Sequence, residues 1–279
     1  MDVICVSVGR VIRTLPRGNQ VLGVTSLDNL LYVLRDGTPS SEIEVYDKDS
    51  YRLQRKFTVR GLDSAVDIVA CSRHRCAYIS DDVNDRVHRV ALPADAIVHS
   101  WPVDDIPAGL SVTDSHSVLV TCPDVSKIKE FSTDGQLLCQ LQLPGDIILP
   151  WHTVQLSSGQ FIVCHGTPFD KESLHRVCLL GSDGQVVKSY GGLQGSGNQY
   201  MAVPIRLAVD RNQFVFVADR LNDRVLVLSP SLTYMREFLL GAEVEGWFLS
   251  TSQPTRLCLN EDKKRLYVAD TKQVFVVSM

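Results

Sequence analysis

Short apolar runs rich in valine, isoleucine, leucine and aromatic residues recur along the chain, and glycine, proline, asparagine and aspartate separate them. The pattern is clearest over residues 189–228, where a glycine-rich lead-in ends at Pro204 and three such runs follow. Apolar runs of this kind, bounded by turn residues, are typical of β-strands. Proline fixes φ and therefore opens the first strand. No stretch shows the period of a useful helix, so the sequence predicts an all-β fold.

This unit of strands and turns is repeated. The heptapeptide Asp-x-x-Asn-Asp-Arg-Val occurs at residues 81–87 and again at 219–225, an offset of 138 residues (219 − 81). That offset corresponds to three units of about 46 residues, the size of a four-stranded propeller blade. Prolines that precede a predicted strand recur at Pro107, Pro150, Pro204 and Pro254.

The repeats predict one domain over residues 1–279, a six-bladed β-propeller of four-stranded antiparallel blades. The predicted blades cover residues 19–61, 62–105, 106–146, 147–192, 193–242 and a last blade from about 247. The last blade has three strands, near 255–260, 265–269 and 273–278. An unpaired sheet edge promotes aggregation, so we expect residues 10–15 to supply the outer strand of this blade and to close the ring, with Val11 and Ile12 buried.

Composition narrows the class of protein. The net charge is −4, so no overall basic field attracts nucleic acid or anionic membranes. No apolar run approaches the ~20 residues of a membrane helix, and the N-terminus lacks the basic start and long apolar core of a secretory signal. We therefore expect a cytoplasmic protein.

The eight cysteines have no Cys-x-x-Cys spacing and are expected to be reduced. Cys71 and Cys76 flank a tight turn, and their pairing stays open.

The segment 189–228 resembles an NHL repeat, whose pattern is a glycine-rich lead-in, Pro, Leu-Ala-Val-Asp, Val-Ala-Asp and Asn-x-Arg-Val. These elements stand here at Pro204, 207–210, 217–219 and 222–225. The resemblance extends over six blades and is strongest in the last two. It implies a propeller similar to the NHL domain of tripartite-motif proteins, in which such a domain selects the substrate of a ubiquitin ligase. The chain has no RING, B-box or coiled-coil region, so ligase activity itself is not assigned.

The resemblance also implies two other functions. Some NHL propellers bind single-stranded RNA on the face that contains the fourth-to-first and second-to-third strand loops. In our predicted loops that face has nine basic and sixteen acidic residues, which disfavours RNA. Other propellers of this shape are metal-dependent lactonases or amidating lyases. Of the seven histidines only His152 is expected near the centre, so we predict no catalytic residues, no metal and no cofactor.

One set of positions departs from the repeat pattern. NHL repeats usually have glycine just before Leu-Ala-Val-Asp, at the start of each inner strand. Two of the six positions keep glycine and four are ionisable; the six residues are Gly23, Asp67, Gly109, His152, Arg206 and Arg256. Inner strands start around the mouth of the central channel, so these side chains are expected to converge. The alternative is that each lies in a seam between blades and pairs with the backbone.

The convergent arrangement predicts a binding site. Arg206 and Arg256 belong to neighbouring blades and would bind one anion, such as a peptide acid or terminal carboxylate, through parallel hydrogen bonds. Trp151 would supply an apolar wall beside His152, and Arg220 would extend the basic sector. Asp67, across the ring, would face a cation of the same ligand. The sequence thus predicts a non-enzymatic, monomeric scaffold that recognises a protein or peptide.

Overall fold

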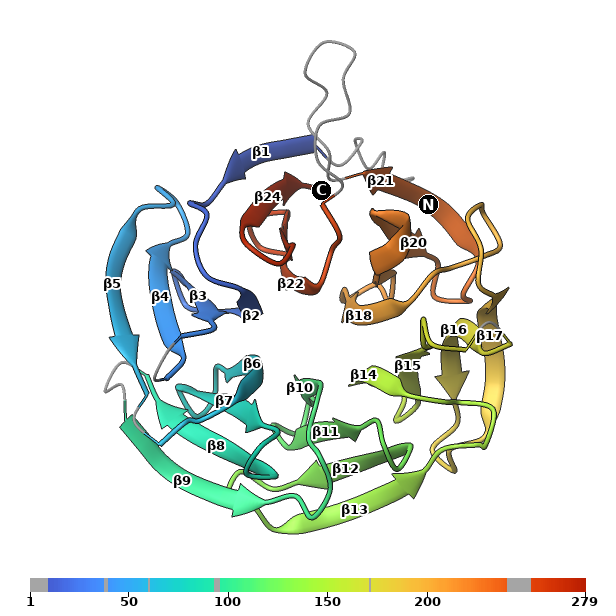
Figure 1. Cartoon of the computed structure of the whole chain (residues 1–279), viewed down its shortest axis with the longest axis horizontal. Coiled ribbons are helices and arrows are strands. Elements are labelled where there is room, and N and C mark those ends of the chain that lie inside the picture. The colour runs from blue at the N-terminus through green and yellow to red at the C-terminus, as the bar shows by residue number, and fades with distance from the viewer. Residues whose placement is uncertain (1–9, 38–39, 60, 93–95, 171, 240–251) are drawn as a thin grey trace.

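The computed structural model describes residues 10–37, 40–59, 61–92, 96–170, 172–239 and 252–279. These residues form six four-stranded antiparallel sheets arranged as blades in a ring (Figure 1). In five of the blades the strands are joined in sequence order and the first of them lies innermost; in the sixth blade the N-terminal strand is the outermost. The predicted six-bladed all-β propeller is therefore confirmed.

The strand bounds follow the predicted layout closely. Blade 1 contains β2 (Val21–Leu27), β3 (Leu30–Arg35), β4 (Glu42–Asp47) and β5 (Leu53–Thr58). Blade 2 contains β6 (Ala65–Cys71), β7 (Cys76–Asp81), β8 (Arg86–Ala91) and β9 (Ala96–Pro102). Blade 3 contains β10 (Leu110–Val112), β11 (Val118–Cys122), β12 (Lys127–Phe131) and β13 (Leu137–Gln142).

The other three blades repeat this arrangement. Blade 4 contains β14 (Pro150–Gln155), β15 (Phe161–His165), β16 (Leu174–Leu180) and β17 (Val186–Leu193). Blade 5 contains β18 (Pro204–Val209), β19 (Val215–Asp219), β20 (Arg224–Leu228) and β21 (Tyr234–Leu239). Blade 6 contains β22 (Arg256–Asn260), β23 (Arg265–Ala269), β24 (Val274–Ser278) and β1 (Arg10–Thr14).

The ring closes as the unpaired edge of blade 6 required. Strand β1 pairs antiparallel with β24, with Arg10 opposite Ser278 and Thr14 opposite Phe275. The burial of side chains in this strand differs from expectation, because Ile12 is 43% exposed and points away from the core. Leu15, at 2% exposure, is the buried side chain of this segment, and its backbone N–H donates to the carbonyl of Val274 at 2.8 Å.

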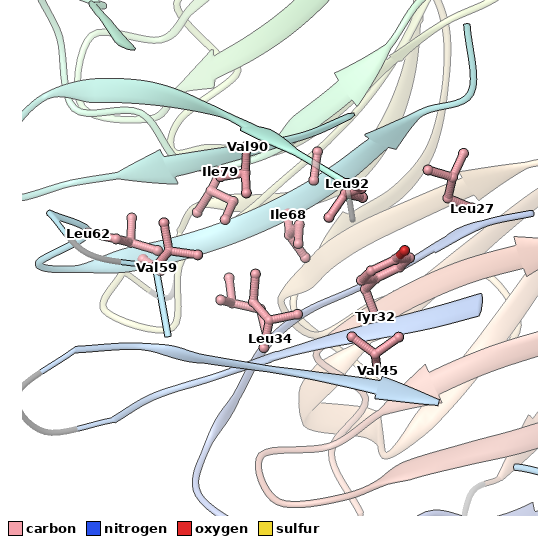
Figure 2. Packing of buried hydrophobic residues seen from close by; sticks show 13 residues of the cluster. Leu27, Tyr32, Leu34, Val45, Val59, Leu62, Ile68, Ile79, Val90 and Leu92 are labelled. Carbon is pink, nitrogen blue, oxygen red and sulfur yellow. The ribbon is translucent and has the colours of Figure 1, made fainter. Parts of the chain in front are cut away.

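The core lies in the seams between blades. The middle strands are buried almost completely, whereas outer strands such as β13 are exposed along most of their length. Figure 2 shows one seam, where Leu34 and Val45 of blade 1 meet Ile68 and Ile79 of blade 2. Burial of such side chains stabilises the fold by about 1.5–3 kcal/mol each. The blades are therefore held as one rigid ring.

Few residues lie outside the blades and their loops. The described helix is one 3₁₀ turn, Arg220–Asn222, and no described helix has the length and apolar character to cross a membrane. Cys71 and Cys76 are register partners across the β6–β7 hairpin, and both are free, buried thiols.

Candidate functional site at the channel mouth

A cavity of about 230 Å³ opens where the inner strands begin. It gathers most of the residues that the sequence singled out. The predicted residues that line it are Asp67, Gly109, Trp151, Arg206, Arg220 and Arg256. Residues from separate blades therefore meet at this cavity. His152 does not line this cavity.

Arg206 and Asp67 form an ion pair across the ring. Arg206 stands on β18 and Asp67 on β6, in blades that face each other across the centre (Figure 1), and the Arg206 Nη2 group donates to Asp67 Oδ1. Asp67 also accepts the backbone N–H of Ile68 at 2.8 Å and that of Leu110 at 2.7 Å. Asp67 therefore neutralises Arg206 within the protein, which differs from the expected role of facing a ligand's cation.

Arg256 has no carboxylate directly against it among the described residues. Its three nitrogen atoms donate to backbone carbonyls: Nε to Leu22, Nη1 to Thr255 at 2.8 Å and Nη2 to Val66 at 3.0 Å. The pKa of Arg256 is lowered to about 10, mainly by burial. The positive charges of Arg206 and Arg220 also lower it, whereas the negative charge of Asp67 raises it. Arg256 is thus a half-buried cation with two other guanidinium groups nearby.

His152 adopts the alternative arrangement, in which the side chain lies in a seam between blades and pairs with the backbone. Its ring is buried in the seam, where Nε2 donates to the carbonyl of Leu110 at 3.0 Å and Nδ1 accepts the N–H of Leu207 at 3.4 Å. Burial and the nearby Arg206 hold its pKa well below the ordinary value, so the ring is neutral. Trp151 does line the cavity, and its indole N–H donates to the carbonyl of Gly166 at 2.8 Å.

The two positions that keep glycine have no room for a side chain. A Cβ atom on Gly109 would lie 2.4 Å from the carbonyl oxygen of Trp151, and one on Gly23 would lie 2.6 Å from Ile68 Cγ2. Real Cβ contacts do not come so close. The pattern of two glycines and four ionisable residues therefore reflects how closely neighbouring blades approach at each inner strand.

The cavity has an excess of positive charge. Three guanidinium groups, of Arg206, Arg220 and Arg256, line it, and Asp67 is the one carboxylate among its described lining residues. Arg220 lies at its edge, with Nε donating to Gln253 Oε1 at 3.2 Å. A buried excess of cations is costly unless an anion compensates it. This arrangement favours an anionic ligand.

The sequence missed several polar residues of the cavity wall. Gln20 and Thr255 contribute to it from the segments that connect blades, and Thr271 from the β23–β24 loop of blade 6. The sequence offered a signal for one of them, because Thr255 directly precedes Arg256. Among the residues that the structure describes, no group of three or more His, Cys, Asp or Glu side chains is arranged to hold a metal ion.

Comparisons with known proteins define the class. No protein-family model matches the chain, and a sequence search of curated proteins found no match. Solved structures match well: hydrazine synthase of Kuenenia stuttgartiensis has a TM-score of 0.65 at 13% identity, covering 97% of this chain and 99% of that one. A streptogramin B lyase has a TM-score of 0.64 at 11% identity, covering 97% and 96%.

A third similar structure is a catalytically inactive variant of virginiamycin B lyase from Staphylococcus aureus with quinupristin. Its TM-score is 0.62 at 10% identity, and the match covers 97% of this chain and 98% of that chain. Identities this low establish a shared fold and leave function open. The protein is a six-bladed all-β propeller, and similarity to tripartite-motif NHL domains rests on the sequence motifs alone.

Proposed function

We propose that this propeller is a non-enzymatic binding scaffold that holds an acidic group of a protein or peptide in the channel-mouth cavity. The observation that carries the proposal is the charge imbalance of that cavity, with three guanidinium groups against one carboxylate. The walls belong to a ring of packed blades, so the cationic groups are preorganised and little ordering is required on binding.

Arg256 is the principal ligand-binding group in this proposal. After its three donations to carbonyl groups, each Nη atom retains one further N–H. Two parallel N–H groups match the oxygens of a carboxylate, whereas Arg206 is already engaged by Asp67. Trp151 offers an aromatic surface for the residue next to the acid. A peptide C-terminus or an acidic side chain has this chemistry.

The motif resemblance to NHL domains extends the proposal to the biological role. In that role the propeller is monomeric and cytoplasmic, and it selects the substrate of a ubiquitin ligase of the tripartite-motif type. Single-stranded RNA and a lyase reaction are the alternatives. The neutral, backbone-bound His152 disfavours a central catalytic base, and the paired Arg206 leaves fewer cations for a phosphate chain.

Capture from a peptide library tests the proposal. The library presents the same sequences with a free C-terminal carboxylate and with a C-terminal amide. We expect Arg256→Gln to lose capture of the free acids while it stays folded, with a lowered thermal midpoint because its bonds to three carbonyls are lost. The Arg206→Ala, Arg256→Ala double variant should lose capture as well. Loss of a buried charged contact costs roughly 2–5 kcal/mol of binding free energy.

The matched control is Arg211→Gln, which removes an arginine whose side chain is 74% exposed on the blade 5–blade 6 side of the ring. Equal capture by wild type and Arg256→Gln would reject the site. A collapsed double variant with a stable, binding-competent Arg256→Gln would show that Arg206 and Arg256 are structural. Turnover of virginiamycin B or quinupristin by the wild type would favour the lyase alternative.

A further inference from the structure

A second cavity, of about 440 Å³, lies in the seam between blades 2 and 3 and shares no lining residue with the channel-mouth cavity. We call it the seam cavity. Its lining includes His74, Cys76, Arg89, Val98, His99 and Asp134. Five of these six residues belong to blade 2 or its first hairpin, and Asp134 comes from the β12–β13 turn of blade 3.

The register of blade 2 places polar side chains in one row. Tyr78 on β7 is opposite Arg89 on β8, which is opposite His99 on β9. Directly opposite residues in antiparallel strands point to the same face of a sheet. That face packs against blade 3, because Trp101 of the same face lies with its ring 6.1 Å from that of Phe131. The row therefore forms one wall of the seam.

Three buried hydrogen-bond donors in this wall have no partner among the described residues. They are Tyr78 OH, Arg89 Nε and Trp101 Nε1. The Cys76 thiol is near Tyr78 and Arg89, but sulfur is a weak acceptor and does not meet hydrogen-bond geometry with either. Arginine and indole N–H groups only donate. An unsatisfied buried donor is costly. Of these three residues Arg89 lines the seam cavity, so its guanidinium is the group that lacks an acceptor which a ligand there would supply.

The rim of the seam cavity is also rich in cations and imidazoles. His74, His99 and His116, three of the seven histidines of the chain, gather here, and the rings of His74 and His116 are 6.1 Å apart. Burial is the largest cause that lowers the pKa of His74. The positive charges of its neighbours Arg89, His116 and Arg73 lower it further, and Asp134 raises it. Asp134 is a weak competitor, because its side chain is 84% exposed and its Oδ1 lies 3.4 Å from Arg89 Nη1.

We propose that the seam cavity binds a phosphate-type oxyanion, held by Arg89 with His74 and His99 at its rim. An oxyanion has only acceptors, which complements the guanidinium of Arg89, a group that only donates. The site is independent of the channel mouth and of the function proposed for it. A cavity of this volume also admits the remainder of a small phosphorylated molecule.

Titration calorimetry with inorganic phosphate and with sulfate, at constant ionic strength set by chloride, tests this. We expect one saturable site per chain in the wild type and at least roughly tenfold weaker binding in Arg89→Gln, since a charge-assisted hydrogen bond is lost. Arg89→Lys keeps the charge without the guanidinium fork, and binding should fall between the two. Arg211→Gln, at an exposed arginine far along the chain, should bind as the wild type does.

Sulfate adds a test of the histidines, because it stays dianionic through the pH range in which imidazole titrates. The ionisable groups around His74 are Arg73 and Cys71 on its own hairpin, Arg89 and His99 from β8 and β9, and His116 and Asp134 from blade 3. Protonated imidazole attracts an anion, so binding should be tighter at about pH 5.5 than at about pH 7.5. His74→Gln should reduce that difference.

Several outcomes would overturn the proposal. These are no saturable heat in the wild type, unchanged affinity in Arg89→Gln, or loss of binding only in Arg256→Gln, which would place the anion at the channel mouth. If Arg89→Gln does not fold, Arg89→Lys carries the test, and a stable Arg89→Lys protein with wild-type affinity for both anions would also count against it. Binding of a phosphorylated small molecule much tighter than that of free phosphate would identify the source of the oxyanion.

Discussion

The heptapeptide Asp-x-x-Asn-Asp-Arg-Val occupies the same place in blades 2 and 5, yet the hydrogen bonds of its arginine differ between the two blades. In blade 5 Asp219 Oδ2 accepts Arg224 Nε at 2.7 Å, and Arg224 also donates to Glu237 and to the carbonyls of Gly197 and Tyr200. In blade 2 the described structure shows no hydrogen bond or ion pair for the Arg86 side chain. Asp81 Oδ2 instead lies 3.3 Å from His88 Nε2.

The surroundings of each loop explain the difference. His88 stands where blade 5 has Leu226, a buried residue of the blade 4–blade 5 core. His88 is neutral because burial lowers its pKa, so Nε2 donates to Asp81 and Nδ1 accepts from Ser100 at 2.8 Å. In blade 5 the glycine-rich lead-in supplies the carbonyls that hold Arg224. Identical local sequences thus take different partners because residues outside the motif decide which donor reaches the acid.

Both loops share one function in the fold. Asp81 accepts the backbone N–H of Asp63, and Asp219 accepts that of Ala202, so each acid ties the lead-in of its blade to the second-to-third strand loop. The asparagine of the motif donates to the acid in both blades, from Asn84 at 3.0 Å and from Asn222 at 2.7 Å. These contacts give the acid and the asparagine of the motif a structural role in both blades.

The largest expected effect separates the two arginines. Arg224→Met leaves the carboxylate of Asp219, which is fully buried, without its cation, and should lower the free energy of unfolding by about 3–5 kcal/mol. Arg86→Met, the matched substitution in blade 2, should change it by about 0.5 kcal/mol or less. Urea denaturation of both variants measures this. Equal losses would show that the two motifs are energetically equivalent.

A smaller effect is expected from converting blade 2 towards blade 5. His88→Leu removes the donor to Asp81 and the acceptor for Ser100, and should cost about 1–2 kcal/mol of unfolding free energy in chemical denaturation. Adding Arg86→Ala in the H88L background shows whether Arg86 has taken over. If Arg86→Ala costs no more unfolding free energy in the H88L background than in the wild type, Arg86 has not replaced His88 as the partner of Asp81. In that case an arginine at this position also needs a lead-in like that of blade 5 to bind the acid.

The smallest expected effect is in the pH dependence of stability. At Asp81 burial raises the pKa, but hydrogen bonds from Asn84 and Asp63 outweigh it, and the pKa lies below the ordinary 3.8. At Asp219 burial outweighs the donors and the pKa is raised above 3.8. Asp81 therefore adds stability above pH 3.8 that is lost as pH falls, whereas the contribution of Asp219 declines as pH rises above 3.8.

Acid unfolding of Asp81→Asn and Asp219→Asn measures these opposite slopes between about pH 3 and pH 6. Stability of Asp81→Asn should fall less steeply on acidification than that of the wild type, and stability of Asp219→Asn should fall more steeply. Only the slopes are compared, because a buried asparagine changes the absolute stability in both variants. Equal slopes in the two variants would contradict the assigned pKa directions.

Much of the fold was predictable because the information for a blade is local. Strand bounds, the six-blade count and pairing of residues 10–15 with β24 all follow from apolar runs, turn residues and one blade with a missing strand. Individual side chains were less predictable. Ile12 was expected in the core and is 43% exposed, since β1 is an outer strand; Val11 packs partly against the core and Leu15 is buried.

The sequence by itself determined that ionisable residues replace glycine at the start of four inner strands, and that these strands surround one channel. Only the tertiary structure decided that Arg206 pairs with Asp67, 139 positions away, that Arg256 binds three carbonyls and that His152 is sealed in a seam. The reason is physical. Strand formation depends on neighbours along the chain, whereas the partner of a charged side chain depends on which groups the closed ring brings within about 3 Å and on how deeply it buries them.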